Sequence, residues 1–139
     1  MKVLVYTFST NKRQDELRAY FGEIFILKKL KEDLEKFSKK ILIEKPELVL
    51  GIGNSERSRI ESETINRFNK NKKIEKQGPE KYYLEKIKVD LPVSTKTTDS
   101  FCNWSAYKLS KFVEEHQLAT KIAFLHLFNK DKLPLLNKN

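Results

Sequence analysis

Cys102 is the only cysteine in the chain, and its predicted position suits a reactive thiol. Asp99 or Ser100 is a good N-cap for a helix, so Cys102 would lie in the first helical turn, where free backbone N–H groups and the helix dipole favour a thiolate. The same position also suits a buried cysteine that only fills space. A single cysteine cannot form an internal disulfide or a cysteine-rich metal site, and we expect no metal or cofactor.

His126 is the candidate base for this thiol. It comes late in an apolar strand predicted over residues 121–128, at the end that would face the same side as the start of the preceding helix. A histidine in such a strand can also be a satisfied core residue. A third polar residue usually holds the imidazole of a cysteine–histidine pair in one tautomer. The carboxylates available for this role are Glu56, Glu61 and Glu63.

The elements that must position these residues alternate between strand and helix along most of the chain. Such alternation predicts an α/β fold with a largely parallel, twisted sheet and right-handed crossovers. Strands are expected at 2–8, 23–30, 47–53 and 121–128, with a further short strand at 93–98. Helices are expected at 12–21, 30–45 and 98–117. Residues 60–90 are split by Gly78-Pro79 and predict an irregular antiparallel excursion.

Length and hydropathy favour one domain. The chain has 139 residues, of which 39% are hydrophobic, which is enough for one core. We therefore predict a single domain over 1–139, with a ragged tail from about residue 129. No stretch approaches the roughly 20 apolar residues of a membrane span, and the first residues lack the pattern of a secretory signal. The expected location is cytoplasmic, with no membrane partner.

The net charge of +9 raises the alternative of a lysine-rich domain that binds polyanions. Its densest cluster is Lys70, Lys72 and Lys73. Most lysines, however, are scattered among 19 acidic residues, and in KKLKEDLEKFSKK the signs alternate as on a solvated helix face. Nucleic acid is therefore not the expected partner.

Several segments match a known family in order. They are the opening MKVLV, KPELVLGIG at 45–53, the run from Arg57 to Asn66, QGPEKYY at 77–83, FCN at 101–103 and FLHL at 124–127. Together they resemble the pyroglutamyl peptidases, also called pyrrolidone-carboxylate peptidases. These are cysteine exopeptidases that remove N-terminal pyroglutamate. The resemblance covers roughly residues 1–128 and implies a three-layer α/β/α sandwich.

The resemblance also implies roles for individual residues. Cys102 would be the nucleophile, His126 its base, and Glu63 the third member that orients the histidine. Counting forward from the arginine of the matching segment selects Glu63, whereas counting back from Asn66 selects Glu61, so both glutamates stay open. The implied substrate is a peptide with a blocked N-terminus.

The segments that form the family's substrate pocket differ most from the pattern. The loop G-F-x-P-F-G-G is TFSTNKR at 7–13 and keeps the aromatic Phe8, and the arginine of A-R-I-P-D-N-E-G corresponds to Arg67. Phe8 and Arg67 are therefore the expected substrate-binding residues. The family's closing helix has no counterpart after His126, so a homo-oligomer stays open as its source.

The resulting prediction is hydrolysis of an N-terminal pyroglutamyl or related amide bond. The first alternative is a protein that keeps the fold, has lost the pocket and acts in binding or assembly. The second is the polyanion-binding domain described above.

Overall fold

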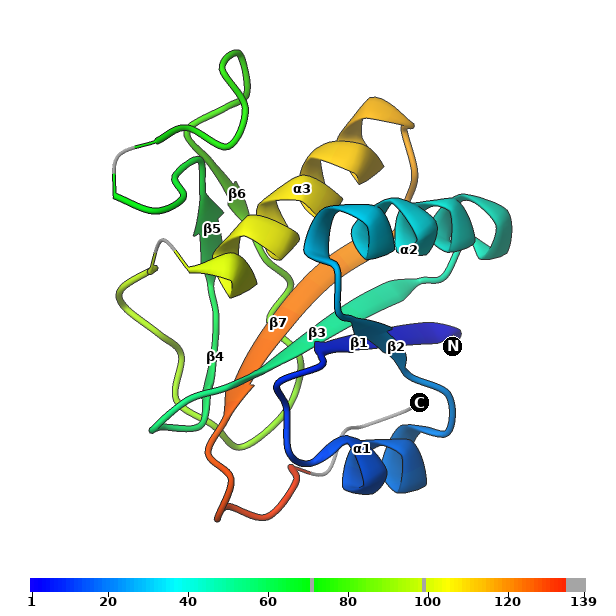
Figure 1. Cartoon of the computed structure of the whole chain (residues 1–139), viewed down its shortest axis with the longest axis vertical. Helices are drawn as coiled ribbons and strands as arrows, with labels where there is room; N and C mark the ends of the chain where they lie inside the picture. The colour runs from blue at the N-terminus through cyan, green and yellow to red at the C-terminus, as the bar shows by residue number, and fades with distance from the viewer. Residues whose placement is uncertain (71, 99, 135–139) are drawn as a thin grey trace.

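The chain folds around a five-stranded sheet, as a computed structural model shows for residues 1–70, 72–98 and 100–134 (Figure 1). The strand order is β2-β1-β3-β7-β4. Neighbouring strands are parallel except at the β4 edge, where β4 runs antiparallel to β7. A separate antiparallel pair joins β5 to β6. The strands are β1 (Val3–Phe8), β2 (Phe25–Leu27), β3 (Leu48–Asn54), β4 (Arg59–Ile60), β5 (Glu63–Ile65), β6 (Lys81–Tyr83) and β7 (Lys121–Leu127).

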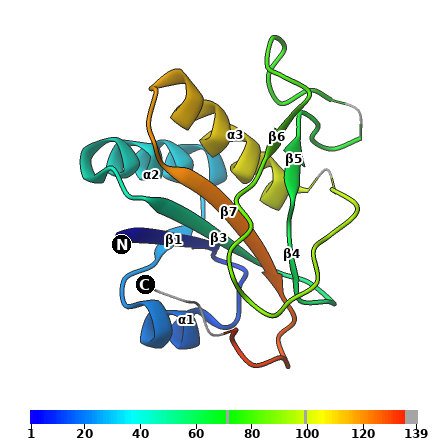
Figure 2. The same cartoon turned by 180° about the vertical axis from the view of Figure 1, so that it is seen from behind.

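Helices cover both faces of the sheet, which confirms the predicted three-layer α/β/α class. Helices α2 (Leu30–Glu44) and α3 (Phe101–Glu115) pack on one face, and the short α1 (Gln14–Phe21) packs on the other (Figure 2). Within the described residues, no helix has the length and apolar character needed to cross a membrane.

Alternation along β1 divides its side chains between the two cores. Leu4, Tyr6 and Phe8 face α2 and α3, whereas Val5 belongs to the core that contains Leu17 of α1. Successive side chains of a strand point to opposite faces, so a mostly apolar run predicts a strand buried on both sides. The prediction for residues 2–8 is confirmed. The apolar stripe of α2 is equally regular, with its buried residues at Leu34, Phe37 and Ile41.

Two predicted strands differ from the structure. The strand expected at 23–30 is limited to Phe25–Leu27. The carboxylate of Asp33 accepts hydrogen bonds from the backbone N–H groups of Lys28 and Lys29, at 2.8 and 2.9 Å, and so turns the chain into α2. The strand expected at 93–98 is wrong: among the described residues of this run, the ladder amounts to an isolated parallel bridge from Val93 to Ile60.

Asn103 ties the start of α3 to β5. Its side-chain oxygen accepts hydrogen bonds from the Thr64 hydroxyl and the Ile65 N–H, at 2.7 and 2.8 Å. Its side-chain nitrogen donates to the carbonyls of Ile65 and Arg67, at 2.9 and 3.0 Å. One buried amide therefore fixes the helix turn that carries Cys102 against the irregular 60–90 region.

Replacing this amide should destabilise the protein. We expect Asn103→Ala to lower the free energy of unfolding by about 2–3 kcal/mol, because several partners lose hydrogen bonds while they stay partly buried. Urea unfolding followed by circular dichroism measures the change. Asn54→Ala is the matched control, since Asn54 is exposed and its side chain makes a long 3.5 Å contact to the Thr10 carbonyl. Equal midpoints for the two variants would contradict the anchoring role.

Candidate active site

A small pocket lies between the first turn of α3, the end of β7 and the segment that follows β4. Cys102 and His126 both line it, over an apolar floor formed by Leu84, Ala106 and Phe124. The pocket encloses about 230 Å³, including space open to solvent.

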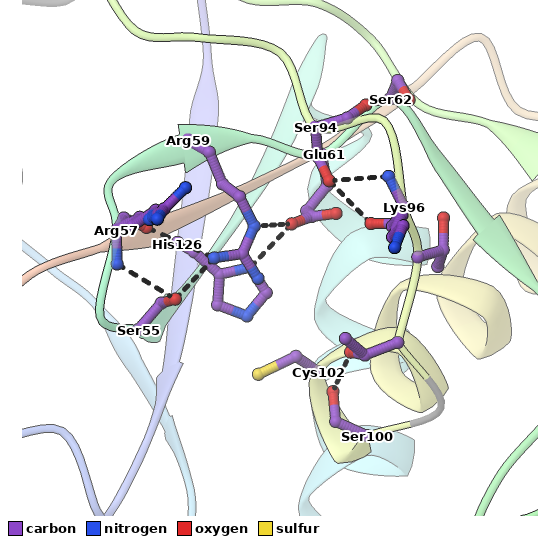
Figure 3. A network of polar contacts seen from close by, with 12 residues as sticks. Ser55, Arg57, Arg59, Glu61, Ser62, Ser94, Lys96, Ser100, Cys102 and His126 are labelled. Atoms are coloured by element: carbon purple, nitrogen blue, oxygen red, sulfur yellow. Dashed lines mark hydrogen bonds and ion pairs between the residues drawn. The ribbon is translucent and has the colours of Figure 1, made fainter.

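The thiol and the imidazole converge on Gly53 of β3. A Cβ built on Gly53 would lie 2.7 Å from Sγ of Cys102 and 3.3 Å from Cδ2 of His126. Both side chains therefore reach the same point above the sheet, one from a helix and the other from the neighbouring strand β7. Figure 3 shows the sulfur pointing out from the first turn of α3 on the side where His126 lies.

Glu61 is the carboxylate that contacts the histidine. Nδ1 of His126 lies 2.9 Å from Oε1 of Glu61, and both side chains are buried. Arg59 donates from Nε to the same oxygen at 2.7 Å. Burial raises the pKa of Glu61, but the hydrogen bonds and positive charges of His126 and Arg59 outweigh burial and hold it below its usual range.

An ionised Glu61 fixes the tautomer of the histidine. A carboxylate only accepts hydrogen bonds, so the proton of the neutral imidazole is on Nδ1 and the lone pair is on Nε2. Nε2 is the nitrogen that can accept a proton from a nearby thiol.

Glu63 takes a different place from the one that the resemblance implies. It also lines the pocket, but its carboxylate pairs with Nζ of Lys81 at 3.4 Å on the β5–β6 pair. The contact with His126 expected of Glu63 is made by Glu61, the alternative selected by counting from Asn66. β4 ends at Ile60, but the backbone N–H of Glu61 still donates to the Phe124 carbonyl at 3.0 Å. This hydrogen bond holds Glu61, and not Glu63, next to the strand that carries His126.

The structure does not bring the two expected substrate-binding residues to the pocket lining that it describes. Phe8 is 3% exposed and packs in the core, with its ring centroid 4.7 Å from that of Phe101. Arg67 is exposed, and its carbonyl accepts the Asn103 hydrogen bond. The loop at 7–13 closes on itself, because Asn11 donates to the Thr7 hydroxyl at 2.9 Å.

Burial raises the pKa of the Cys102 thiol to about 12, which reverses the sequence-based expectation of a thiolate. Ser100 and the positive charge of Arg59 act in the lowering direction, and the negative charge of Glu61 adds to the rise. The sulfur lies on the inward side of α3, with Ala106 and Leu109. The effect of desolvation on the thiol pKa therefore outweighs the lowering effect expected from the helix N-terminus. Ser100 is the N-cap, without a side-chain capping bond, and Asp99 lies outside the described residues.

Arg59 has no part in the sequence-based prediction. The signal for it is the spacing of Arg59 and Glu61, since residues two apart on an extended segment share a face. In the part of the chain that the structure describes, no group of three or more His, Cys, Asp or Glu side chains could hold a metal ion.

The fold and the site define an α/β protein with a cysteine, a histidine and a glutamate gathered beside a mostly parallel sheet. No family model and no curated protein sequence matches the chain. Solved structures do match, and they include several pyroglutamyl peptidases.

The pyrrolidone carboxyl peptidase of Thermococcus litoralis matches with a TM-score of 0.72 and 17% identity, over 92% of this chain and 77% of that one. Pyroglutamyl peptidase I of Bacillus amyloliquefaciens matches with a TM-score of 0.72 and 16% identity, over 91% and 80% of the two chains. A variant of the Pyrococcus furiosus pyrrolidone carboxyl peptidase gives 0.72 and 15%, over 96% and 88%. The predicted resemblance is confirmed at the level of the fold.

The raised pKa predicts a slowly reacting thiol in the resting protein. At about pH 8, iodoacetamide should modify native Cys102 on the order of a thousandfold more slowly than the same chain unfolded in urea, because only the thiolate reacts. Mass spectrometry after timed quenching gives both rates, since the chain has one cysteine. Native alkylation as fast as that of the unfolded chain would contradict a neutral resting thiol.

Proposed function

We propose that this protein is a cysteine peptidase that hydrolyses an N-terminal pyroglutamyl or related amide bond. The observation that carries the proposal is the 2.9 Å contact between Nδ1 of His126 and Oε1 of Glu61, beside a thiol in the same pocket. A fold shared with pyroglutamyl peptidases supports it. The roles are Cys102 as nucleophile, His126 as base and Glu61, rather than Glu63, as the residue that orients the histidine.

The proposed cycle begins with a neutral thiol. Nε2 of His126 accepts the proton of Cys102 while Sγ bonds to the scissile carbonyl carbon. Backbone N–H groups near the start of α3 stabilise the oxyanion. The C–N bond then breaks, and the amine leaves with the proton from Nε2. Water attacks the thioester, gives its proton to His126 and releases the acid, and the proton returns to the sulfur.

The pocket favours a compact acyl group. Its apolar floor of Leu84, Ala106 and Phe124 suits the ring carbons of a small group such as the lactam of pyroglutamate. A blocked N-terminus carries no ammonium charge, so it can lie against the apolar floor without the desolvation cost of a cation. The substrate class is therefore a peptide or amide with a small, uncharged N-terminal acyl group.

A second candidate function is binding or assembly without catalysis. It draws support from the pKa of about 12 for Cys102 and from the positions of Phe8 and Arg67 outside the described pocket lining. The two functions differ in one readout. A protein of the second kind leaves the bond of a pyroglutamyl amide intact, whereas a peptidase cleaves it.

Hydrolysis of a fluorogenic pyroglutamyl amide tests the first proposal. We expect turnover by the wild type, no turnover by Cys102→Ala, and a loss of about 10²–10⁴ in kcat for His126→Ala, as for removal of a general base. Glu61→Gln should lose about 10²–10⁴-fold in kcat, because an amide at this position no longer stabilises the imidazolium.

Glu63→Gln is the matched control, since it removes a carboxylate from the same pocket without touching His126. It should keep kcat within about threefold of the wild type. Equal losses in the two glutamine variants would contradict the assignment to Glu61. An inactive wild type would contradict the peptidase proposal itself.

A further inference from the structure

Arg59 occupies a bridging position that the proposed cycle does not use. Its Nε donates to Oε1 of Glu61, and its Nη1 donates to the hydroxyl of Ser55 and, at 3.3 Å, to the carbonyl of Arg57 (Figure 3). The guanidinium therefore connects the loop after β3 to the carboxylate beside His126. A planar fork with several fixed donors can hold both partners at once, which a lysine ammonium does with less geometric control.

Strand pairing brings Arg59 to the face of the sheet that carries the histidine. Arg59 is directly opposite His126 in the antiparallel β4–β7 ladder. Opposed residues of such a ladder project to the same face, with Cβ atoms about 4.5–5.5 Å apart. His126 follows Phe124 by two residues, and Phe124 packs in the core beneath α3. The guanidinium thus faces the side of the sheet on which Cys102 lies.

One carboxylate oxygen of Glu61 accepts hydrogen bonds from both Arg59 and His126. Oε1 of Glu61 lies 2.7 Å from Arg59 Nε and 2.9 Å from His126 Nδ1. The arginine offsets the negative charge that Glu61 would otherwise direct at the thiol. It also holds the carboxylate in the orientation that the imidazole needs. Both effects are strong here, because Glu61 and His126 are buried and the local dielectric is low.

The charged and titratable groups around the thiol come from four strands. They are Arg59 and Glu61 from β4 and its extension, His126 from β7, and the Glu63–Lys81 pair from β5 and β6. The Glu63–Lys81 contact is longer, at 3.4 Å, and Lys81 is exposed to solvent. Arg59 is therefore the positive group best placed to act on the sulfur.

We propose that Arg59 is a positioning residue of this site: its guanidinium fixes Glu61 against His126 and stabilises the thiolate that forms when the Cys102 proton passes to Nε2. The proposal rests on the proposed cysteine peptidase function for its second readout only. The positive charge of Arg59 already acts to lower the pKa of Cys102, against the larger effect of burial.

Three variants test the two parts of this role. Arg59→Gln removes both the positive charge and the planar set of guanidinium donors, whereas Arg59→Lys keeps the charge and loses the planar donors. Arg57→Gln is the matched control, because it removes an exposed neighbouring charge. The first readout is the rate of iodoacetamide alkylation of Cys102 at about pH 8 to 9, which needs no substrate. The second is kcat on the pyroglutamyl amide.

We expect Arg59→Gln to slow alkylation about tenfold, the effect of one pKa unit on the thiolate fraction. Arg59→Lys should restore the alkylation rate to within about threefold of the wild type and still lower kcat at least about fivefold, because the ammonium cannot bridge Ser55 and Glu61. Arg57→Gln should match the wild type in both readouts. If Arg59 had a purely structural role, its substitutions would change stability, and Arg59→Lys would not combine a normal alkylation rate with a reduced kcat.

If Arg59→Gln folds and its Cys102 is alkylated at the wild-type rate, the proposal is overturned. If that variant does not fold, Arg59→Lys decides alone: reduced kcat with normal alkylation supports the positioning role, and unchanged kcat overturns it. An inactive wild type whose alkylation still slows in Arg59→Gln would overturn the peptidase function and leave the charge effect standing. An active wild type, together with an Arg59→Gln variant of unchanged alkylation rate and kcat, would support the peptidase function and overturn the role of Arg59.

Discussion

The close approach of side chains to β3 is the constraint on which the site depends. A Cβ on Gly53 would lie 2.7 Å from Sγ of Cys102, and one on Gly51 would lie 2.5 Å from ring atoms of both Tyr6 and Phe124. Any larger residue would push the start of α3 or the β7 side chains away from the sheet. The two glycines thus provide the space in which a helix residue and a strand residue meet.

The carboxylate reaches the histidine through the antiparallel edge strand. β4 spans two residues, but its surroundings fix it firmly: the backbone N–H of Phe128 donates to the Ser58 hydroxyl at 2.9 Å, and Ser58 donates to Asp131 at 2.6 Å. These bonds join the loop before β4 to the segment after β7. Short edge strands held by side-chain bonds can set a single side chain accurately without a long ladder.

Much of this fold follows from local patterns, whereas the site depends on contacts between distant segments. Buried runs such as residues 121–128 and the stripe of α2 predict their elements, because period and burial agree. The choice between Glu61 and Glu63 depends on where a two-residue strand ends, and no periodicity encodes that. The position of Phe8 could not be predicted either. An aromatic side chain suits contact with a substrate ring, but the fold of the 7–13 loop leaves Phe8 in the core. The thiolate was predicted from the position of Cys102 at the N-terminus of a helix. Its pKa is set mainly by burial in the tertiary structure, which the local sequence does not reveal.

A thiol that is neutral at rest is compatible with the cysteine chemistry we propose. Burial disfavours a free thiolate, and the same low dielectric strengthens the attraction between a thiolate and the imidazolium formed beside it. Proton transfer to His126 during attack on a bound acyl group never exposes an isolated charge. Glu61 then stabilises the imidazolium, and Arg59 offsets the repulsion between Glu61 and the sulfur. A site of this kind reacts slowly with small solvent reagents, and its nucleophile forms readily only when a carbonyl carbon is held within reach.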